Sequence, residues 1–141
     1  MNGFHLYALP VLVAAVIQWV IGALWYGVAF RKRWTVLVGN IGESKPGRSA
    51  FTMIASFALN LILSFVLANL IAGLTQLFSA GTTNFQLGVS VGILCWFGLI
   101  APPMLNQAIF ERRPANLFAI NAAYWIVAMA ISGGTLAAML K

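Results

Sequence analysis

The sequence contains very few charged residues. Of its 141 residues, 8 are Lys or Arg and 2 are acidic, so charged residues make up only 7 % of the chain. A soluble domain averages roughly 25 % charged residues, and a water-soluble fold could not cover its surface with so few. Apolar residues make up 62 % of the sequence. This composition indicates a chain whose solvent is lipid.

The residue types that build catalytic and metal sites are also scarce. The sequence has one histidine, His5, one cysteine, Cys95, and two widely separated glutamates, Glu43 and Glu111. A zinc or di-iron site requires about three or four such ligands, and an activated nucleophile requires a neighbouring base. We therefore expect no catalytic site, no metal and no other cofactor, and we predict that the protein is not an enzyme.

The net charge of +6 does not indicate a partner made of nucleic acid. The basic residues lie in short links between long apolar runs, where phospholipid headgroups would meet them. We expect membrane lipid, including anionic headgroups, as a partner, and we exclude nucleic acid.

Four apolar runs are long enough to cross a membrane, which requires about 20 residues for a hydrocarbon core of about 30 Å. They are residues 7–29, 50–77, 86–109 and 115–140. No Lys or Arg precedes the first run, so we interpret it as a retained span rather than a cleavable signal peptide. The links, including residues 31–49, are expected to be loops. The sequence therefore predicts an all-α membrane protein, a single domain of four transmembrane helices in an antiparallel bundle.

The distribution of positive charge predicts the orientation of this bundle. The basic residues of the first and third links are Arg31, Lys32, Arg33, Lys45, Arg48, Arg112 and Arg113. The second link carries no charge. Links rich in Lys and Arg stay in the cytoplasm, so both termini should face outward. Trp25, Tyr26 and Trp34 would then flank the inner interface of a multi-pass membrane protein as an aromatic belt.

Uncharged polar and indole side chains fall near mid-depth in the spans. They are Gln18, Trp19, Asn60, Ser64, Trp96 and Trp125. Each indole N–H needs an acceptor in a medium that offers few, and Gln18 or Asn60 could supply it. Ser56, Asn60 and Ser64 recur at intervals of four, which places them on one helix face. These residues either form interhelical hydrogen bonds or line a polar pocket at the midplane, and the sequence leaves both interpretations open.

Proline and glycine pairs predict local helix geometry. Pro102 and Pro103 remove backbone donors from the third run, which predicts either a kink or a polar vestibule open to the cytoplasm. Asn106 and Gln107 follow closely and could bond the freed carbonyls. Gly88 and Gly92, one turn apart, allow close helix contact. That contact would serve either the four-helix core or a homo-oligomer.

The predicted cytoplasmic surface combines aromatic and charged side chains. Its candidate interface residues are Trp25, Tyr26, Arg31, Lys32, Arg33, Trp34, Glu111, Arg112 and Arg113. Glu111 is expected to pair with a base of the first link or with the indole N–H of Trp34, which would tie the two links together. The alternative is that Glu111 is solvated and that the neighbouring arginines bind anionic headgroups.

Two segments resemble a known family. They are GALWYGVAFRKRW, Gly22 to Trp34, and CWFGLIAPPMLNQAIFERRPANLFAINAAYW, Cys95 to Trp125. Together they resemble the bacterial domain-of-unknown-function family seventeen-sixty-one, which comprises small membrane proteins with four predicted helices. The matching positions are Gly22, Ala23, Leu24, Trp25, Tyr26, Lys32 and Trp34, then Phe110, Glu111, Arg113 and Pro114. The chain departs from the family at Gly27-Val28, where a Ser-Pro pair is frequent. The resemblance implies no activity, and it directs attention to the predicted cytoplasmic interface.

These observations predict an integral membrane protein without enzymatic activity that packs lipid or a partner through its bundle and its basic links. The alternative is a small transporter or channel with an uncharged polar pocket at the midplane. A proton-coupled antiporter is disfavoured, because Gln18 stands where such exporters need a membrane-embedded glutamate. A membrane enzyme is disfavoured because the arginines and glutamates lie in links.

Overall fold

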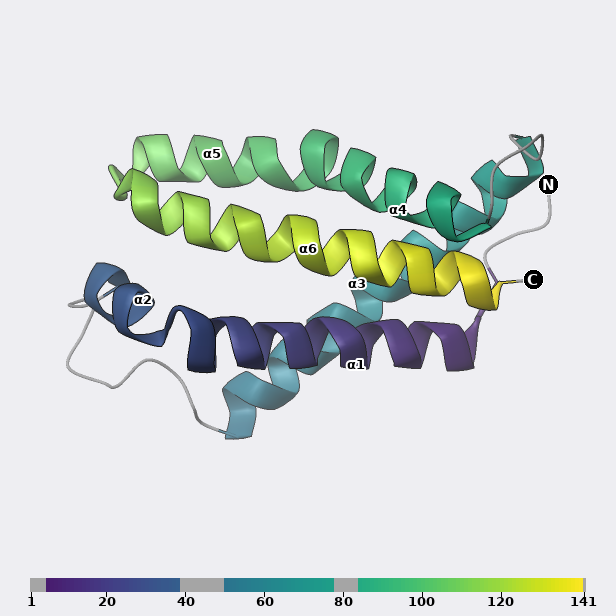
Figure 1. Cartoon of the computed structure of the whole chain (residues 1–141), viewed down its shortest axis with the longest axis horizontal. Helices are drawn as coiled ribbons and strands as arrows, with labels where there is room; N and C mark the ends of the chain where they lie inside the picture. The colour runs from purple at the N-terminus through teal and green to yellow at the C-terminus, as the bar shows by residue number, and fades with distance from the viewer. Residues whose placement is uncertain (1–4, 39–49, 78–83, 141) are drawn as a thin grey trace.

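The structure, a computed structural model, describes residues 5–38, 50–77 and 84–140, which are almost entirely helical (Figure 1). In chain order the elements are α1 (Ala8–Leu24), the π-helical turn η1 (Trp25–Ala29), α2 (Arg31–Val38), α3 (Ala50–Leu77), α4 (Asn84–Cys95), the π-helical turn η2 (Trp96–Ile100), α5 (Ala101–Phe110) and α6 (Ala115–Met139).

Four stretches are long and apolar enough to cross a membrane, at Ala8–Ala29, Ala50–Leu77, Phe85–Phe110 and Ala115–Met139. Each bound agrees with the predicted span to within one residue, so the predicted fold of four apolar helices is confirmed. Figure 1 shows that α1 begins and α6 ends at one end of the bundle, while α2 and the α5–α6 turn lie at the other. Which end faces the cytoplasm stays a prediction, as does the single-domain organisation.

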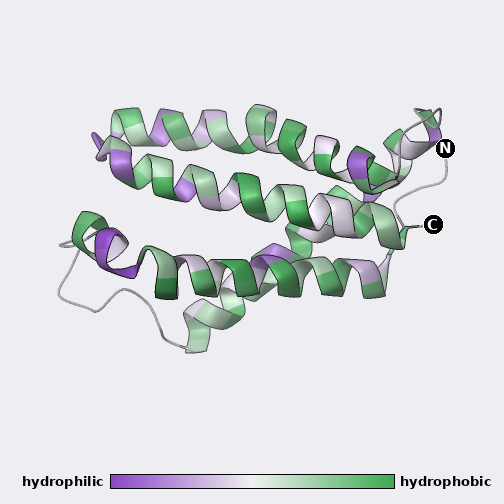
Figure 2. Cartoon of the chain, in the orientation of Figure 1, coloured by the Kyte–Doolittle hydropathy of each residue, from purple (hydrophilic) through white to green (hydrophobic). Residues whose placement is uncertain are grey.

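Polar residues concentrate at the end that holds α2 and the α5–α6 turn, which we call the α2 end (Figure 2). The first link was predicted to be a loop, and that prediction was wrong for Arg31–Val38, which forms α2. Phe30 interrupts the helix with φ −117° and ψ 12°, and no glycine or proline follows before Gly39, so a new helix starts at once. Lys45, Arg48 and most of the second link lie outside the described residues.

Helix α6 is the centre of the bundle, between α1 on one side and α4–α5 on the other (Figure 1). Its buried face joins the apolar core at Met129, Leu136 and Ala137. Helix α3 crosses behind (Figure 1) and contributes Leu67, Ala68 and Ile71 to that core. Because α1, α3 and α4 all pack against α6, this helix has buried residues along its whole length.

The backbones of α4 and α6 touch at glycines. A Cβ atom built on Gly88 would lie 2.0 Å from the carbonyl oxygen of Gly133, and one built on Gly92 would lie 2.2 Å from that of Met129. Only residues without a side chain allow this approach. The predicted Gly88–Gly92 contact therefore serves the four-helix core within the chain.

The proline pair interrupts the third span as a π-helical turn. Neither proline has an N–H to donate to the preceding turn, and the N–H of Ala101 bonds the carbonyl of Trp96 five residues back. A similar turn ends the first span, where the N–H of Phe30 bonds the carbonyl of Trp25 at 2.9 Å. The hydrogen bond found for the amide of Gln107 among the described residues goes to Glu111 rather than to a freed carbonyl. Both π-helical turns begin at a tryptophan.

Candidate functional site

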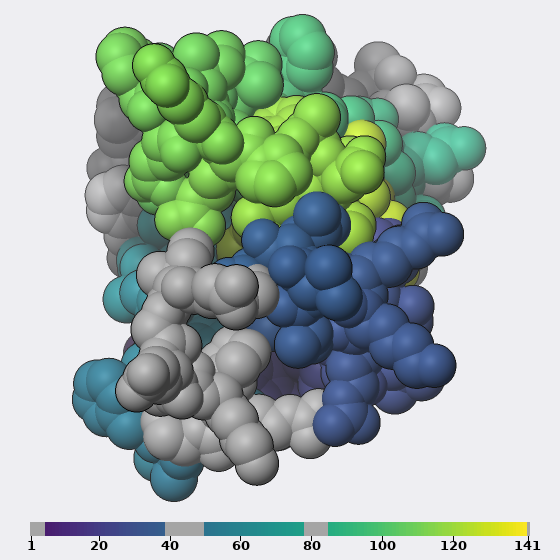
Figure 3. Space-filling view, turned by 90° about the vertical axis from the view of Figure 1, so that its left-hand side faces the viewer, coloured from purple at the N-terminus to yellow at the C-terminus, as the bar shows by residue number. Residues whose placement is uncertain are grey.

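A groove of about 530 Å³ opens at the α2 end, between α2 and the first turns of α6. Helix α2 supplies Lys32, Arg33, Val36 and Leu37 to this α2–α6 groove. Helix α6 supplies Asn116, Ala119 and Ile120. Figure 3 views this end, with α2 in blue against the light green start of α6. The groove thus combines two exposed cations with apolar walls.

The two cations of the groove have no acidic partner in the part of the chain that the structure describes. The ion pair found there joins Glu111 to Arg113. Lys32 and Arg33 are exposed side chains, so their charges are presented to whatever occupies the groove or its rim. A cation with an apolar neighbour on the same helix face suits an amphiphilic anion.

Aromatic residues hold α2 against α6. The ring of Tyr26 lies edge-on to Trp34 of α2, with centroids 5.5 Å apart. The same ring lies 5.3 Å from that of Tyr124 on α6, and its hydroxyl donates to Oδ1 of Asn121 at 2.9 Å. The predicted interface residues Trp25, Tyr26 and Trp34 therefore do gather at the α2 end, and Tyr26 connects three helical segments there.

Two indoles donate to backbone carbonyls of α6. Nε1 of Trp25 donates to Ile120 and Nε1 of Trp96 donates to Ala122, each at 3.1 Å. The indole of Trp96 was predicted to find its acceptor in Gln18 or Asn60, and that prediction was wrong. A helical carbonyl keeps a second lone pair after its helix bond is made, so α6 itself supplies the acceptors.

Three of the polar residues predicted at the midplane are buried within the bundle. Gln18, Asn60 and Ser64 are buried, with exposed fractions of 0, 5 and 0 %, whereas Ser56 is exposed, because α3 crosses the bundle obliquely and its first turns diverge from α1 (Figure 1). Within the described residues, neither amide atom of Gln18 nor the hydroxyl of Ser64 has a hydrogen-bond partner.

The mid-depth tryptophans do not form one cluster. Trp19 packs edge-on against Phe57 of α3 with centroids 6.5 Å apart, and Trp125 lies 5.0 Å from Tyr124, while Trp96 bonds α6 from the far side. Three further polar residues of the bundle, Asn121, Tyr124 and Ser132, all on α6, were not predicted from the sequence. The sequence feature that could have indicated them is three polar residues within an apolar span, separated by three and then eight positions.

The α5–α6 turn (residues 111–114) closes helix α5 with a left-handed residue. Arg112 has φ 51°, its N–H bonds Ile109, and the N–H of Arg113 bonds Ala108 at 2.9 Å. These two bonds are the pattern of a Schellman cap, in which the left-handed position usually holds glycine. The turn brings the side chain of Arg113 back toward the end of α5.

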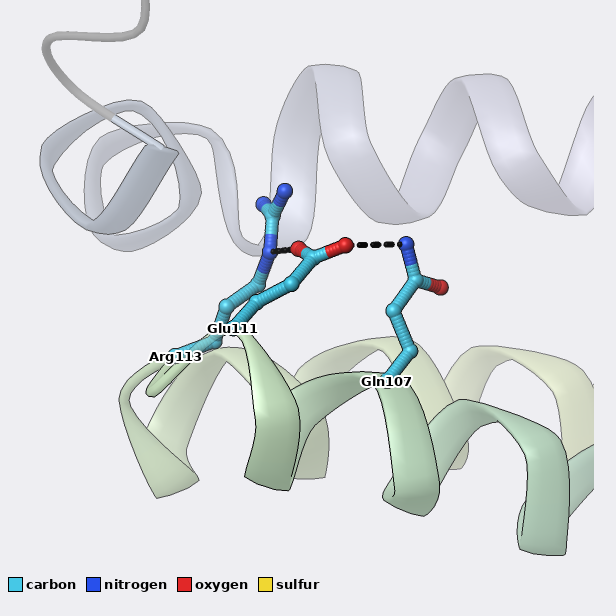
Figure 4. Close-up of polar contacts among 3 residues, drawn as sticks. All are labelled: Gln107, Glu111 and Arg113. Carbon is cyan, nitrogen blue, oxygen red and sulfur yellow. Dashed lines mark hydrogen bonds and ion pairs between the residues drawn. The ribbon is translucent and has the colours of Figure 1, made fainter.

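The carboxylate of Glu111 lies between two side chains close to it in the sequence, those of Gln107 and Arg113 (Figure 4). Its Oε1 accepts from Nε2 of Gln107 at 2.8 Å, and its Oε2 pairs with Nε of Arg113. These hydrogen bonds, that of Gln107 first, hold the pKa of Glu111 below its usual value. The predicted pair with Arg31, Lys32, Arg33 or Trp34 was wrong, because the cap geometry offers Glu111 nearer partners.

A second hollow, of about 190 Å³, lies between α5 and α6. Its lining, from α5, the α5–α6 turn and α6, comprises Met104, Gln107, Ala108, Arg113, Leu117, Phe118 and Asn121. We call it the α5–α6 cavity. Among the described residues, no three His, Cys, Asp or Glu side chains come together to offer a metal-ligand set.

Comparison with known proteins gives one match. The family model described as "Protein of unknown function (DUF1761)" matches residues 9–137. Neither the search of curated proteins nor the search of solved structures finds a match to this chain. The matched range includes all four apolar helices nearly in full, together with both segments that carry the resemblance noted from the sequence. The chain therefore belongs to the DUF1761 family.

Proposed function

We propose that this chain is a non-enzymatic, multi-pass protein of the bacterial inner membrane that binds anionic phospholipid in the α2–α6 groove. The observation that supports this most is the pairing of two cations, Lys32 and Arg33, with the apolar walls of that groove. Neither cation has an acidic partner among the residues that the structure describes. The phosphate of the headgroup would lie against the two cations. The upper part of an acyl chain would cover Val36 and Ile120.

The energetics favour an anionic lipid over a neutral one. Each Lys or Arg near a membrane surface attracts anionic lipid by about 1 kcal/mol. Val36 has 79 % of its surface exposed, and each methylene buried against such a side chain contributes about 0.8 kcal/mol. The apolar contribution is common to all phospholipids, so the two cations set the selectivity.

The proposed orientation puts the α2 end in the cytoplasm. Five of the eight basic residues, Arg31 to Arg33 with Arg112 and Arg113, lie at this end, and such residues stay on the cytoplasmic side. Trp25, Tyr26 and Trp34 gather at the same level, as residues of an interfacial belt do. The cytoplasmic leaflet is also where negative surface potential attracts basic segments.

The alternative of a small transporter or channel has one observation in its favour. Gln18, Ser64 and Ser132 are buried, and their polar atoms have no partner within the described part of the chain. Neither the groove nor the α5–α6 cavity is lined by these residues, so we prefer the lipid-binding function. A homo-oligomer stays a prediction, and its interface would not use Gly88 and Gly92, which are buried against α6.

Native mass spectrometry of the delipidated protein tests this proposal. The protein would be offered equal amounts of phosphatidylglycerol and phosphatidylcholine with identical acyl chains. Two cations at about 1 kcal/mol each predict a roughly thirtyfold preference for phosphatidylglycerol. Lys32→Gln and Arg33→Gln should each lower that preference about fivefold.

Arg31→Gln is the matched control, because Arg31 is an exposed cation of the same helix that does not line the groove. It should leave the preference nearly unchanged. Equal retention of the two lipids by the wild type would contradict the proposal. So would an effect of Arg31→Gln as large as that of Arg33→Gln, which would indicate diffuse attraction to α2 rather than a site.

A further inference from the structure

The first turns of α6 separate two hollows of different chemistry. Ala119 and Ile120 face the α2–α6 groove, while Leu117, Phe118 and Asn121 face the α5–α6 cavity. The groove has two cations without acidic partners in the described residues. The α5–α6 cavity has one cation, Arg113, and that cation is paired with Glu111.

Glu111 does not itself line the α5–α6 cavity, but its carboxylate bonds Gln107 and Arg113, which do. Both signs of charge therefore lie together next to the cavity. The ion pair uses Nε of Arg113. The N–H groups of the two terminal guanidinium nitrogens are therefore available to donate to another acceptor. Glu111 accepts one bond on each oxygen, and a carboxylate has about four lone-pair sites. The carboxylate can accept from a further donor without releasing either partner.

We propose that the α5–α6 cavity seats the headgroup of a zwitterionic aminophospholipid, with its phosphate on Arg113 and its ammonium on Glu111. The guanidinium matches phosphate geometry, and an ammonium that carries N–H groups can donate to the carboxylate. The lowered pKa of Glu111 is consistent with this, because the carboxylate is charged at neutral pH.

The size and surroundings of the cavity fit a headgroup rather than a whole lipid. About 190 Å³ accommodates a phosphoethanolamine group, while the acyl chains would remain outside. The neighbouring surface of α5 exposes Leu105, Ile109 and Phe110, with exposed fractions of 46, 65 and 80 %. An anionic headgroup gains little here, because Glu111 cancels the charge of Arg113.

The test uses the whole protein and a series of lipids that differ by single methyl groups. Wild-type protein would be offered phosphatidylethanolamine, its monomethyl and dimethyl derivatives, and phosphatidylcholine, all with the same acyl chains, and retention would be read by native mass spectrometry. Each methyl removes an N–H donor, so retention should fall along the series, by about tenfold overall for one lost charge-assisted hydrogen bond. Equal retention along the series would overturn the proposal without any substitution.

Substitutions then locate the effect. Glu111→Gln should abolish the preference for phosphatidylethanolamine over phosphatidylcholine and raise retention of phosphatidylglycerol, because Arg113 loses its counterion. Arg113→Gln should lower retention of every phospholipid in the series. Arg112→Gln is the matched control, since Arg112 belongs to the same turn but neither lines the cavity nor forms an ion pair among the described residues. A wild-type lipid preference in Glu111→Gln would overturn the proposal.

This site is independent of the α2–α6 groove. Lys32→Gln should leave the methylation series unchanged, and Glu111→Gln should leave the contribution of Lys32 unchanged. Failure of one proposal therefore leaves the other standing.

Discussion

Replacing Gly88 by alanine tests the contact between α4 and α6. The added Cβ would lie 2.0 Å from the carbonyl oxygen of Gly133 and 2.5 Å from the Cβ of Ala137. Ordinary van der Waals contact begins near 3.4 Å, so the two helices must separate by more than an ångström along their interface. The obstructing atoms are backbone and a β-carbon, which cannot swing aside.

The expected cost follows from the rigidity of that contact. Overpacking a core costs about 1–3 kcal/mol, and we expect about 3 kcal/mol here because no flexible side chain can relieve the clash. Replacing a helical glycine by alanine is otherwise favourable by about 1 kcal/mol. The net destabilisation should therefore be about 2 kcal/mol.

Gly73→Ala is the matched control, because a Cβ built on Gly73 meets nothing within 4 Å. The helix-propensity gain of about 1 kcal/mol is common to both variants, so their free energies of unfolding should differ by about 3 kcal/mol. Unfolding in mixed micelles of increasing dodecyl sulfate content, followed by tryptophan fluorescence, measures this difference. Equal stability of the two variants would refute the close contact between α4 and α6.

Three further predictions concern single residues. Arg112→Gly should raise stability by about 1 kcal/mol in thermal unfolding, because φ 51° costs an arginine that much and a glycine nothing; a loss of stability would contradict the capped turn. Trp96→Phe should lower the free energy of unfolding by about 1 kcal/mol, because it deletes the hydrogen bond to the carbonyl of Ala122. Trp19→Phe should lower it by less in the same assay, because the indole of Trp19 has no hydrogen bond among the described residues. The pKa of Glu111 is lowered in the folded protein, so the stabilisation that its carboxylate gives is present above the usual pKa of 4.5 and is lost as the pH falls through the folded pKa. Below pH 4.5 the thermal midpoint of the wild type should therefore drop relative to that of Glu111→Gln. Parallel dependence of the two midpoints on pH would contradict this prediction.

The spans could be predicted from the sequence because bilayer thickness alone fixes their length. The predicted bounds agree with Ala50–Leu77 and the other three stretches to within one residue. Burial of Gln18 and Asn60 was predictable for a related reason, since lipid offers their polar atoms no partner.

Contacts between helices could not be predicted in the same way, because they depend on register and rotation. The acceptor for Trp96 is a carbonyl of α6, and every residue has a carbonyl, so no residue type marks it. Helix α2 was missed because isolated helices of this length are marginal in water and its position depends on Tyr26, which contacts Trp34. Without α2 in place, the groove beside Lys32 and Arg33 could not be foreseen.

Photo-cross-linking in the native membrane tests the lipid-binding account most directly. A benzophenone amino acid at Val36, which lines the α2–α6 groove, would capture the lipid there, and the same group at Ile54, an exposed residue of α3 that lines neither hollow, would sample bulk lipid. The account predicts that adducts at Val36 are enriched in anionic phospholipid relative to those at Ile54, and that Lys32→Gln with Arg33→Gln removes the enrichment. Adducts of the same composition at both positions would contradict it.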